Sequence, residues 1–184
     1  MIRPIEIKNF LNEKECDSMI ELSDTIGFKP AETAYESEII KNLDFNKREI
    51  AYIKSDKFNE VFKNLSNNVL YKINSLTIFK GLEYDNIGNY SFNKYSTNDF
   101  LNYHNDFHEI KFGATITVVL ELSNNYDGGE FCYIYNNEEL QFKKGRGSLY
   151  IFDSNMMHKV NPITNGIRYS INCWPKYSIK KSLI

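Results

Sequence analysis

The 184-residue sequence predicts a mainly β domain, a sandwich or barrel, braced by helices near its N-terminus. From Gly88 onward, roughly seven or eight short runs rich in β-branched and aromatic residues alternate with clusters of Gly, Asn, Asp and Pro. Before that point, two stretches place apolar residues at helical spacing. Hydrophobic residues at 42% and aromatic residues at 15% suit a packed globule rather than a disordered chain.

The first predicted helix lies within residues 9–28. Asn12 can cap it, Glu15 follows three residues later as in a capping box, and Gly27 suits its end. The second is predicted between residues 56 and 76, with an apolar stripe made of Phe58, Val61, Phe62, Leu65, Val69, Leu70 and Ile73. Between the helices, "REIAYI" predicts a strand. The weakly periodic segment Tyr35–Ile50 predicts a long loop, which is a candidate lid over a substrate.

Charge and apolar patterning exclude some classes of function. The formal net charge is −2 and no basic block stands out, so we expect neither a nucleic-acid nor a membrane partner. No apolar run approaches the roughly 20 residues of a membrane span, and "MIRPIEIKNF" lacks the apolar core of a signal peptide. The three widely spaced cysteines predict reduced thiols, so we expect a cytoplasmic protein.

The segment "YHNDFH" contains two of the three histidines. In extended backbone His104 and Asp106 point to the same side, and His158, after the strand "GSLYIF", could complete a metal site. Two imidazoles and one carboxylate form the 2-His-1-carboxylate pattern of non-haem Fe(II) oxygenases, which leaves coordination positions open. His108 competes for this role, because its spacing from His104 suits a helix, but the segment lacks a helical stripe. A solvated loop without metal is the alternative.

Ten residues beyond His158, Arg168 and Ser170 occupy positions i and i+2 of a predicted strand, so both can face one interior. A guanidinium fork binds a carboxylate through two charge-assisted hydrogen bonds, and a serine hydroxyl can add a third. A buried guanidinium needs an anionic partner, which is either a ligand carboxylate or one of the protein's own acids. The phenol of Tyr95 could contact the same carboxylate.

These residues occur in order within "FNKYSTNDFLNYHND", "LELSNNYDGGEF" and "GSLYIFDSNMMHKVNPITNGIRYSINCW". Between about residues 91 and 174, the chain resembles the prolyl 4-hydroxylase-like branch of the Fe(II)/2-oxoglutarate dioxygenases, especially the oxygen-sensing type. Gly128 and Gly129 of the "GGE" element predict a tight turn with positive φ. Glu130 is read as an acid that stabilises this turn rather than as a ligand.

The resemblance implies a double-stranded β-helix, or jelly roll, in a single domain spanning residues 1–184. Residues 81–178 would form the jelly-roll core, and residues 1–80 would be mostly helical support with the possible lid. The implied cofactors are Fe(II), 2-oxoglutarate and O2, with ascorbate as reductant. By the match, His104, Asp106 and His158 would bind the iron, Arg168, Tyr95 and Ser170 would bind 2-oxoglutarate, and Trp174 would line the substrate side.

The resemblance also implies hydroxylation of prolyl residues in a protein or peptide, with release of succinate and CO2. Arg48 and Lys111 are candidate contacts to such a peptide, and ordinary surface charges are the alternative. Two other functions stay open. One is the same chemistry on a lysyl residue, a free amino acid or a small metabolite. The other is a catalytically silent jelly-roll module that only binds a partner.

Overall fold

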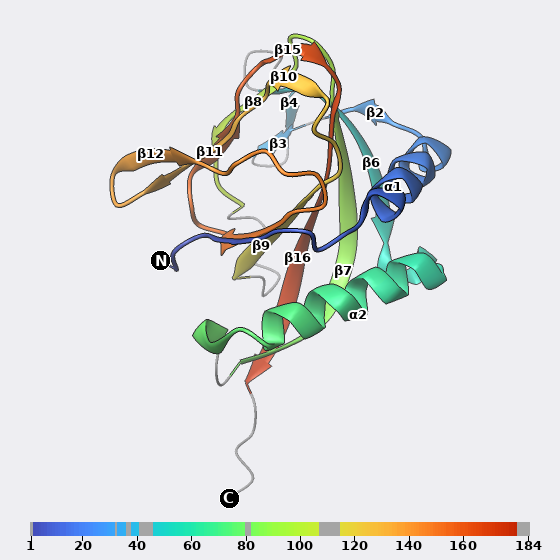
Figure 1. Cartoon of the computed structure of the whole chain (residues 1–184), viewed down its shortest axis with the longest axis vertical. Coiled ribbons are helices and arrows are strands. Elements are labelled where there is room, and N and C mark those ends of the chain that lie inside the picture. The colour runs from blue at the N-terminus through green and yellow to red at the C-terminus, as the bar shows by residue number, and fades with distance from the viewer. Residues whose placement is uncertain are drawn as a thin grey trace, which may run out of the picture.

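The structure is a computed structural model that describes residues 2–31, 33–35, 38–40, 46–79, 82–106 and 115–179 (Figure 1). Two facing antiparallel sheets form its centre. The larger sheet contains, in spatial order, β1 (Ile5–Ile7), β13 (Leu149–Asp153), β9 (Ile116–Glu121), β16 (Arg168–Ile179), β7 (Leu82–Tyr95), β6 (Glu49–Lys54) and β2 (Lys29–Pro30). The smaller contains β12 (Glu138–Gln141), β11 (Phe131–Tyr135), β14 (His158–Val160), β8 (Phe100–His104) and β5 (Asn46–Lys47). The prediction of a mainly β fold is confirmed.

The larger sheet separates two apolar cores, and alternate residues of β9 pack into one core or the other. Val118 and Leu120 pack in the outer core, which lies between the sheet and the helices. Val119 packs in the inner core, where it meets residues of the smaller sheet such as Phe131 and Val160. All six residues of β9 are buried. A strand covered on both faces reads as a continuous apolar run, which explains "ITVVLE".

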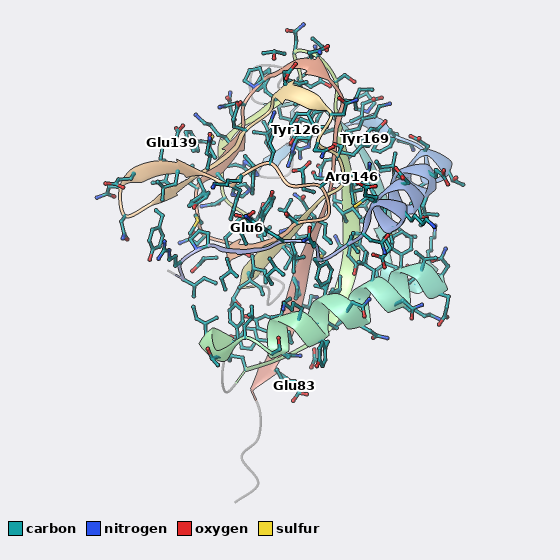
Figure 2. The ribbon with its side chains drawn as sticks, viewed as in Figure 1. Glu6, Glu83, Tyr126, Glu139, Arg146 and Tyr169 are labelled. Atoms are coloured by element: carbon teal, nitrogen blue, oxygen red, sulfur yellow. The ribbon has the colours of Figure 1, made fainter. Side chains whose placement is uncertain are left out.

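The helix α1 (Glu13–Ile26) begins and ends where the sequence predicts. The Glu15 backbone N–H donates to Asn12 Oδ1 at 3.0 Å, and the Asn12 backbone N–H donates to Glu15 Oε2 at 2.7 Å, which completes the capping box. Gly27 follows with φ of +89°. Arg146, in the loop after β12, pairs with Asp17 and so fastens this loop to the helix (Figure 2).

The helix α2 (Glu60–Asn74) packs against β7 on the outer face of the larger sheet (Figure 1). It begins later than predicted, because residues Ser55–Lys57 form the 3-10 turn η1 and Asn59 is the N-cap, accepting from the Phe62 N–H at 3.2 Å. Its buried stripe is Phe62, Leu65, Val69 and Ile73. Val61 is 44% exposed, so its place in the predicted stripe is wrong. A second 3-10 turn, η2 (Thr77–Phe79), follows the helix.

The first 80 residues contain more strand than expected. The strands β1, β2 and β6 join the larger sheet, β5 joins the smaller, and β3 (Thr33–Tyr35) pairs with β4 (Glu38–Ile40). The segment expected to be one long loop therefore contains short strands where it is described, whereas residues 36–37 and 41–45 lie outside the described residues. Strands of two or three residues take their conformation from the strand beside them, so their own sequence carries little periodicity.

The "GGE" element makes the turn that the sequence predicts. Gly128 closes β10 (Tyr126–Gly128), which pairs with β15 (Ile163–Gly166), and Gly129 follows it. Their φ values are +69° and +65°. A Cβ atom on Gly128 would lie 2.3 Å from the carbonyl oxygen of Pro162, so both the backbone conformation and the close approach require glycine.

Two further expectations concern the whole chain. Cys16, Cys132 and Cys173 are free thiols and buried, as expected. Among the helices in the described ranges, none combines the length and the apolar character needed to cross a membrane.

Candidate active site

The two predicted histidine ligands lie next to each other on paired strands. His104 ends β8, His158 begins β14, and the two residues face each other directly in the antiparallel register. Their ring centroids are 4.1 Å apart. The Nδ1–H of His104 donates to the carbonyl oxygen of Asn102 at 3.0 Å, and that of His158 to the carbonyl oxygen of Met156 at 2.9 Å. These bonds assign the lone pair of each ring to Nε2.

Asp106 completes the cluster two residues beyond His104. Its Oδ1 lies 3.8 Å from His104 Nε2, and its Oδ2 lies 3.8 Å from His158 Nε2. One ligand atom from each residue falls within 4.8 Å of the others. The Asp106 backbone N–H donates to the carbonyl oxygen of Ser154 at 2.8 Å, and the Thr117 hydroxyl donates to Oδ2 at 2.6 Å. The carboxylate is therefore held from both its backbone and its side chain.

Electrostatics keep His104 and Asp106 in the protonation states that a metal needs. Burial, followed by the charge of His158, lowers the pKa of His104 to about 3. Burial alone would raise the pKa of Asp106, but His158, His104 and the Thr117 hydrogen bond outweigh it, so the net shift is downward. The imidazole of His104 is thus neutral and the carboxylate of Asp106 is ionised at neutral pH. Metal binding requires these deprotonated forms.

The cluster fits a divalent iron site. Both Nε2 atoms and the carboxylate converge, and each of the three side chains is held in its orientation by a hydrogen bond to a neighbouring residue. Three protein ligands on one side leave coordination positions open for other molecules. His108, the competing histidine, lies outside the described residues, so its exclusion stays a prediction.

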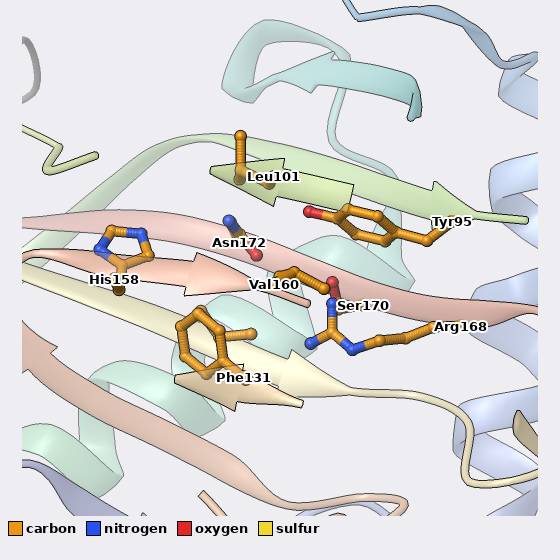
Figure 3. Close-up of a pocket in the computed structure, with 9 residues that line it drawn as sticks. Tyr95, Leu101, Phe131, His158, Val160, Arg168, Ser170 and Asn172 are labelled. Carbon is orange, nitrogen blue, oxygen red and sulfur yellow. The ribbon is translucent and has the colours of Figure 1, made fainter. Parts of the chain in front are cut away.

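A pocket extends from His158 into the space between the sheets (Figure 3). Successive inward positions of β16 line its length, since Arg168, Ser170 and Asn172 alternate along the strand. Tyr95 stands opposite Arg168 in the β7–β16 register, and its hydroxyl points toward the middle of the pocket. The other lining residues are Leu101, Val119, Phe131 and Val160. The structure thus brings Arg168, Tyr95 and Ser170 together at the end away from His158.

The partner of Arg168 is an acid of the protein itself. Arg168 and Glu121 are 1% and 2% exposed. Arg168 Nη2 and Nε donate to the same oxygen, Glu121 Oε2, at 2.7 and 3.1 Å. Of the two partners that the sequence left open, this structure contains the internal one. Burial would lower the pKa of the guanidinium, but the carboxylate of Glu121 more than offsets this effect and the net shift is upward.

Glu121 is the site residue that sequence reasoning missed. A signal for it was present, since Glu121 is the one charged residue in the apolar run "ITVVLE" and shares its phase with Thr117 and Val119. A buried carboxylate requires a buried cation, and arginines are few in this chain. These two facts make Glu121 a candidate partner for one of the four arginines, although they do not say which one.

The remaining predicted substrate contacts are Trp174, Arg48 and Lys111. The indole nitrogen of Trp174 is buried beside Asp106, but lacks hydrogen-bond geometry to any partner among the described residues. The guanidinium carbon of Arg48 lies 6.0 Å from the centroid of the Tyr95 ring, and that of Arg168 lies 5.3 Å from it. Arg48 therefore stands beside the pocket wall. Lys111 lies outside the described residues.

Comparison with known proteins agrees with this geometry. Residues 90–176 match the family model of the 2OG-Fe(II) oxygenase superfamily. A PKHD-type hydroxylase of Pseudomonas putida is 31% identical over 39% of this chain, and the match covers 32% of that protein. The chain thus spans about a third of the length of this curated relative.

Solved structures show the same fold. A prolyl hydroxylase from Trichoplax adhaerens, in complex with a hypoxia inducible factor peptide fragment, superposes with a TM-score of 0.75 at 21% identity, covering 94% of this chain and 83% of that one. A prolyl-4-hydroxylase of Pseudomonas putida gives a TM-score of 0.71 at 18% identity, covering 94% and 91%. The resemblance to prolyl hydroxylase-like 2OG-Fe(II) oxygenases that the motifs indicate is confirmed, as is the jelly-roll fold.

Proposed function

We propose that this chain is a 2-oxoglutarate-dependent Fe(II) dioxygenase that hydroxylates prolyl residues in a protein or peptide. One observation carries the proposal. His158, which belongs to the cluster with His104 and Asp106, and the guanidinium of Arg168 stand at opposite ends of one pocket (Figure 3). His104, Asp106 and His158 would hold the metal, 2-oxoglutarate would chelate it through its oxo-acid end, and the other carboxylate of 2-oxoglutarate would reach toward Arg168. The matching family and relatives support the same chemistry.

In this proposal the iron and 2-oxoglutarate supply the oxidation, in which O2 converts 2-oxoglutarate to succinate and CO2 and hydroxylates the substrate. The chain's own residues would bind the metal and 2-oxoglutarate, orient them, and exclude water from the pocket. Thr117 and the carbonyls of Asn102 and Met156 orient the three ligands. Tyr95 and Ser170 would contact the co-substrate beside Arg168. No side chain is required as a general base, and ascorbate would serve as the reductant that keeps the iron divalent.

The substrate side of the site would lie near Trp174 and Arg48. Nε and Nη1 of Arg48 are buried and have no hydrogen-bond partner among the described residues. Its charge also contributes to the lowered pKa of His104, although burial is the largest cause. Guanidinium nitrogens without a partner near the cluster suit a carbonyl or carboxylate of a substrate. Lys111 remains a predicted contact from sequence alone.

Arg48 also favours a second candidate within the same chemistry. A free amino acid or small metabolite carries a carboxylate, which would pair with these guanidinium nitrogens more strongly than a peptide carbonyl does. The similar solved structures are prolyl hydroxylases, one of them in complex with a peptide fragment, which favours a prolyl residue in a peptide. We therefore place the peptide first and the small acid second.

The domain boundaries also belong to the proposal. We infer that residues 1–184 act as one domain, with residues 81–178 as the jelly-roll core. Buried residues of α1 and α2, such as Met19 and Phe62, share one core cluster with Val118 and Ile171 of the larger sheet. Helices and sheet therefore support each other.

The test is succinate production from 2-oxoglutarate with Fe(II) and ascorbate, with and without a panel of proline-containing peptides and free amino acids. Peptide-stimulated succinate, with a gain of one oxygen on proline, would support the first candidate, and stimulation by a free acid would support the second. His158→Ala should abolish turnover. Lys159→Ala is the matched control, because Lys159 is the next residue but pairs with exposed Glu139. Bound Fe(II) without any turnover would favour the silent binding module.

A further inference from the structure

The buried pair of Arg168 and Glu121 raises a problem of charge. Both Arg168 donors that face Glu121 reach the single atom Oε2. The other oxygen, Oε1, is buried and has no hydrogen-bond partner within the described ranges. The guanidinium and the carboxylate cancel, so this end of the pocket has no net charge from the pair. A second carboxylate arriving there would be a buried charge without a counter-charge, which is strongly unfavourable.

No other described cation that faces Glu121 can readily supply the missing charge, since the guanidinium of Arg48 lies beside the Tyr95 ring, 6.0 Å from its centroid, and is not among the charges that act on Glu121. Lys144 lies over the Tyr126 ring, with its Nζ 4.2 Å from the ring centroid, and donates to the Tyr126 carbonyl oxygen, but it is exposed. Tyr126 and Tyr150 also face Glu121. Burial, followed by the charge of Glu121, raises the pKa of both phenols, so they are neutral at pH 7. Glu121 is therefore the group whose charge can change.

We propose that Glu121 is a proton-linked competitor for Arg168, and that the far carboxylate of 2-oxoglutarate pairs with the guanidinium only when Glu121 takes up a proton. The inference rests on the proposed function, because it takes 2-oxoglutarate as the ligand. The proton would bind at Oε1, the oxygen without a partner. A protonated Glu121 still accepts from Arg168 through its other oxygen and can donate its O–H to a neighbour.

The direction of this linkage follows from the charges. Burial raises the pKa of Glu121 even though Arg168 opposes that effect, so proton uptake is less costly here than at a surface glutamate. A bound carboxylate would raise this pKa further. Binding of 2-oxoglutarate then consumes a proton wherever Glu121 is ionised in the free protein. One consumed proton weakens binding about tenfold for each unit of rising pH.

The experiment is calorimetric titration of 2-oxoglutarate into Mn(II)-loaded protein, without O2, at pH 6, 7 and 8. Two buffers with different ionisation enthalpies at each pH count the protons. We expect the wild type to bind at most one proton together with 2-oxoglutarate. Its Kd for 2-oxoglutarate should rise by about tenfold for each unit of rising pH. Glu121→Gln should bind more tightly at pH 8, with no uptake and a Kd independent of pH. Glu138→Gln, on the exposed strand β12, is the matched control and should behave as the wild type.

Several outcomes separate this inference from the proposed function. Binding of 2-oxoglutarate by the wild type without proton uptake would overturn the inference and leave the proposed function standing. Weaker binding by Glu121→Gln than by the wild type would also overturn it. The wild-type proton count needs no variant, so poor folding of Glu121→Gln would not leave the inference untested. If the wild type and both variants bound Mn(II) but none of them bound 2-oxoglutarate at any pH, the inference and the proposed function would both fail.

Discussion

Replacing Thr117 by valine should weaken metal binding without disturbing the fold. Thr117 is fully buried, and its hydroxyl donates to Asp106 Oδ2 at 2.6 Å. Valine keeps the shape of the side chain but removes this donor from a carboxylate. A hydrogen bond to a charged group contributes about 1.5–3 kcal/mol. Since about 1.4 kcal/mol corresponds to a factor of ten, we expect the variant to bind metal roughly 10- to 100-fold more weakly.

The assay is anaerobic titration with Fe(II) or Mn(II) in competition with a chelator of known affinity. Thr115→Val is the matched control, because it removes a neighbouring hydroxyl that lies 3.1 Å from the Tyr84 hydroxyl and does not touch a ligand. Thermal unfolding should show that both metal-free variants still fold, each with a single cooperative transition. Equal metal affinities for the two variants would refute the idea that Thr117 orients the carboxylate.

Three further results are expected. His158→Ala should lose Fe(II) binding while His108→Ala keeps it, and the reverse outcome in the same anaerobic titration would contradict the assignment of the ligands. The metal-free protein should lose up to about 1.4 kcal/mol of its free energy of unfolding for each pH unit below about 6.5. The reason is that His104 takes up a proton in the unfolded chain, whereas its lowered pKa keeps it neutral in the folded chain. Equal pH slopes of the melting temperature for wild type and His104→Asn would argue against this. Gly128→Ala should cost about 1–3 kcal/mol in denaturant unfolding, since its Cβ would lie 2.3 Å from a backbone oxygen at positive φ. Gly88→Ala meets nothing within 4 Å, so a similar loss there would contradict the reasoning.

The sequence was most informative where one local rule acted alone. The capping box of Asn12 and Glu15 placed the start of α1 correctly, because both hydrogen bonds join residues three apart. The grouping of His104, Asp106 and His158 was predictable for a related reason. His104 and Asp106 share one side of an extended segment, and the chain offers few other histidines.

Predictions were weaker where distant residues decide the outcome. Val61 looked like part of an apolar stripe, yet it is exposed because the sheet covers only the side of α2 that carries Phe62 and Leu65. The partner of Arg168 depended on which strand lies beside β16, and β9 reaches that position from 47 residues away in sequence. Local patterns do not encode such neighbours.

The placement of β9 between two cores has a consequence for how the chain avoids misfolding. A slip of one residue against its neighbours would exchange the two faces of the strand. Val118 and Leu120 would turn toward the pocket, and Thr117 and Glu121 would turn toward the helices, away from Asp106 and Arg168. The slipped state would thus lose apolar packing, and the charge of Glu121 would lie among apolar side chains without Arg168 as its partner. The two different faces of β9 therefore favour the native register of the larger sheet. Thr117 and Glu121, which would prepare the site for catalysis, also destabilise the slipped register.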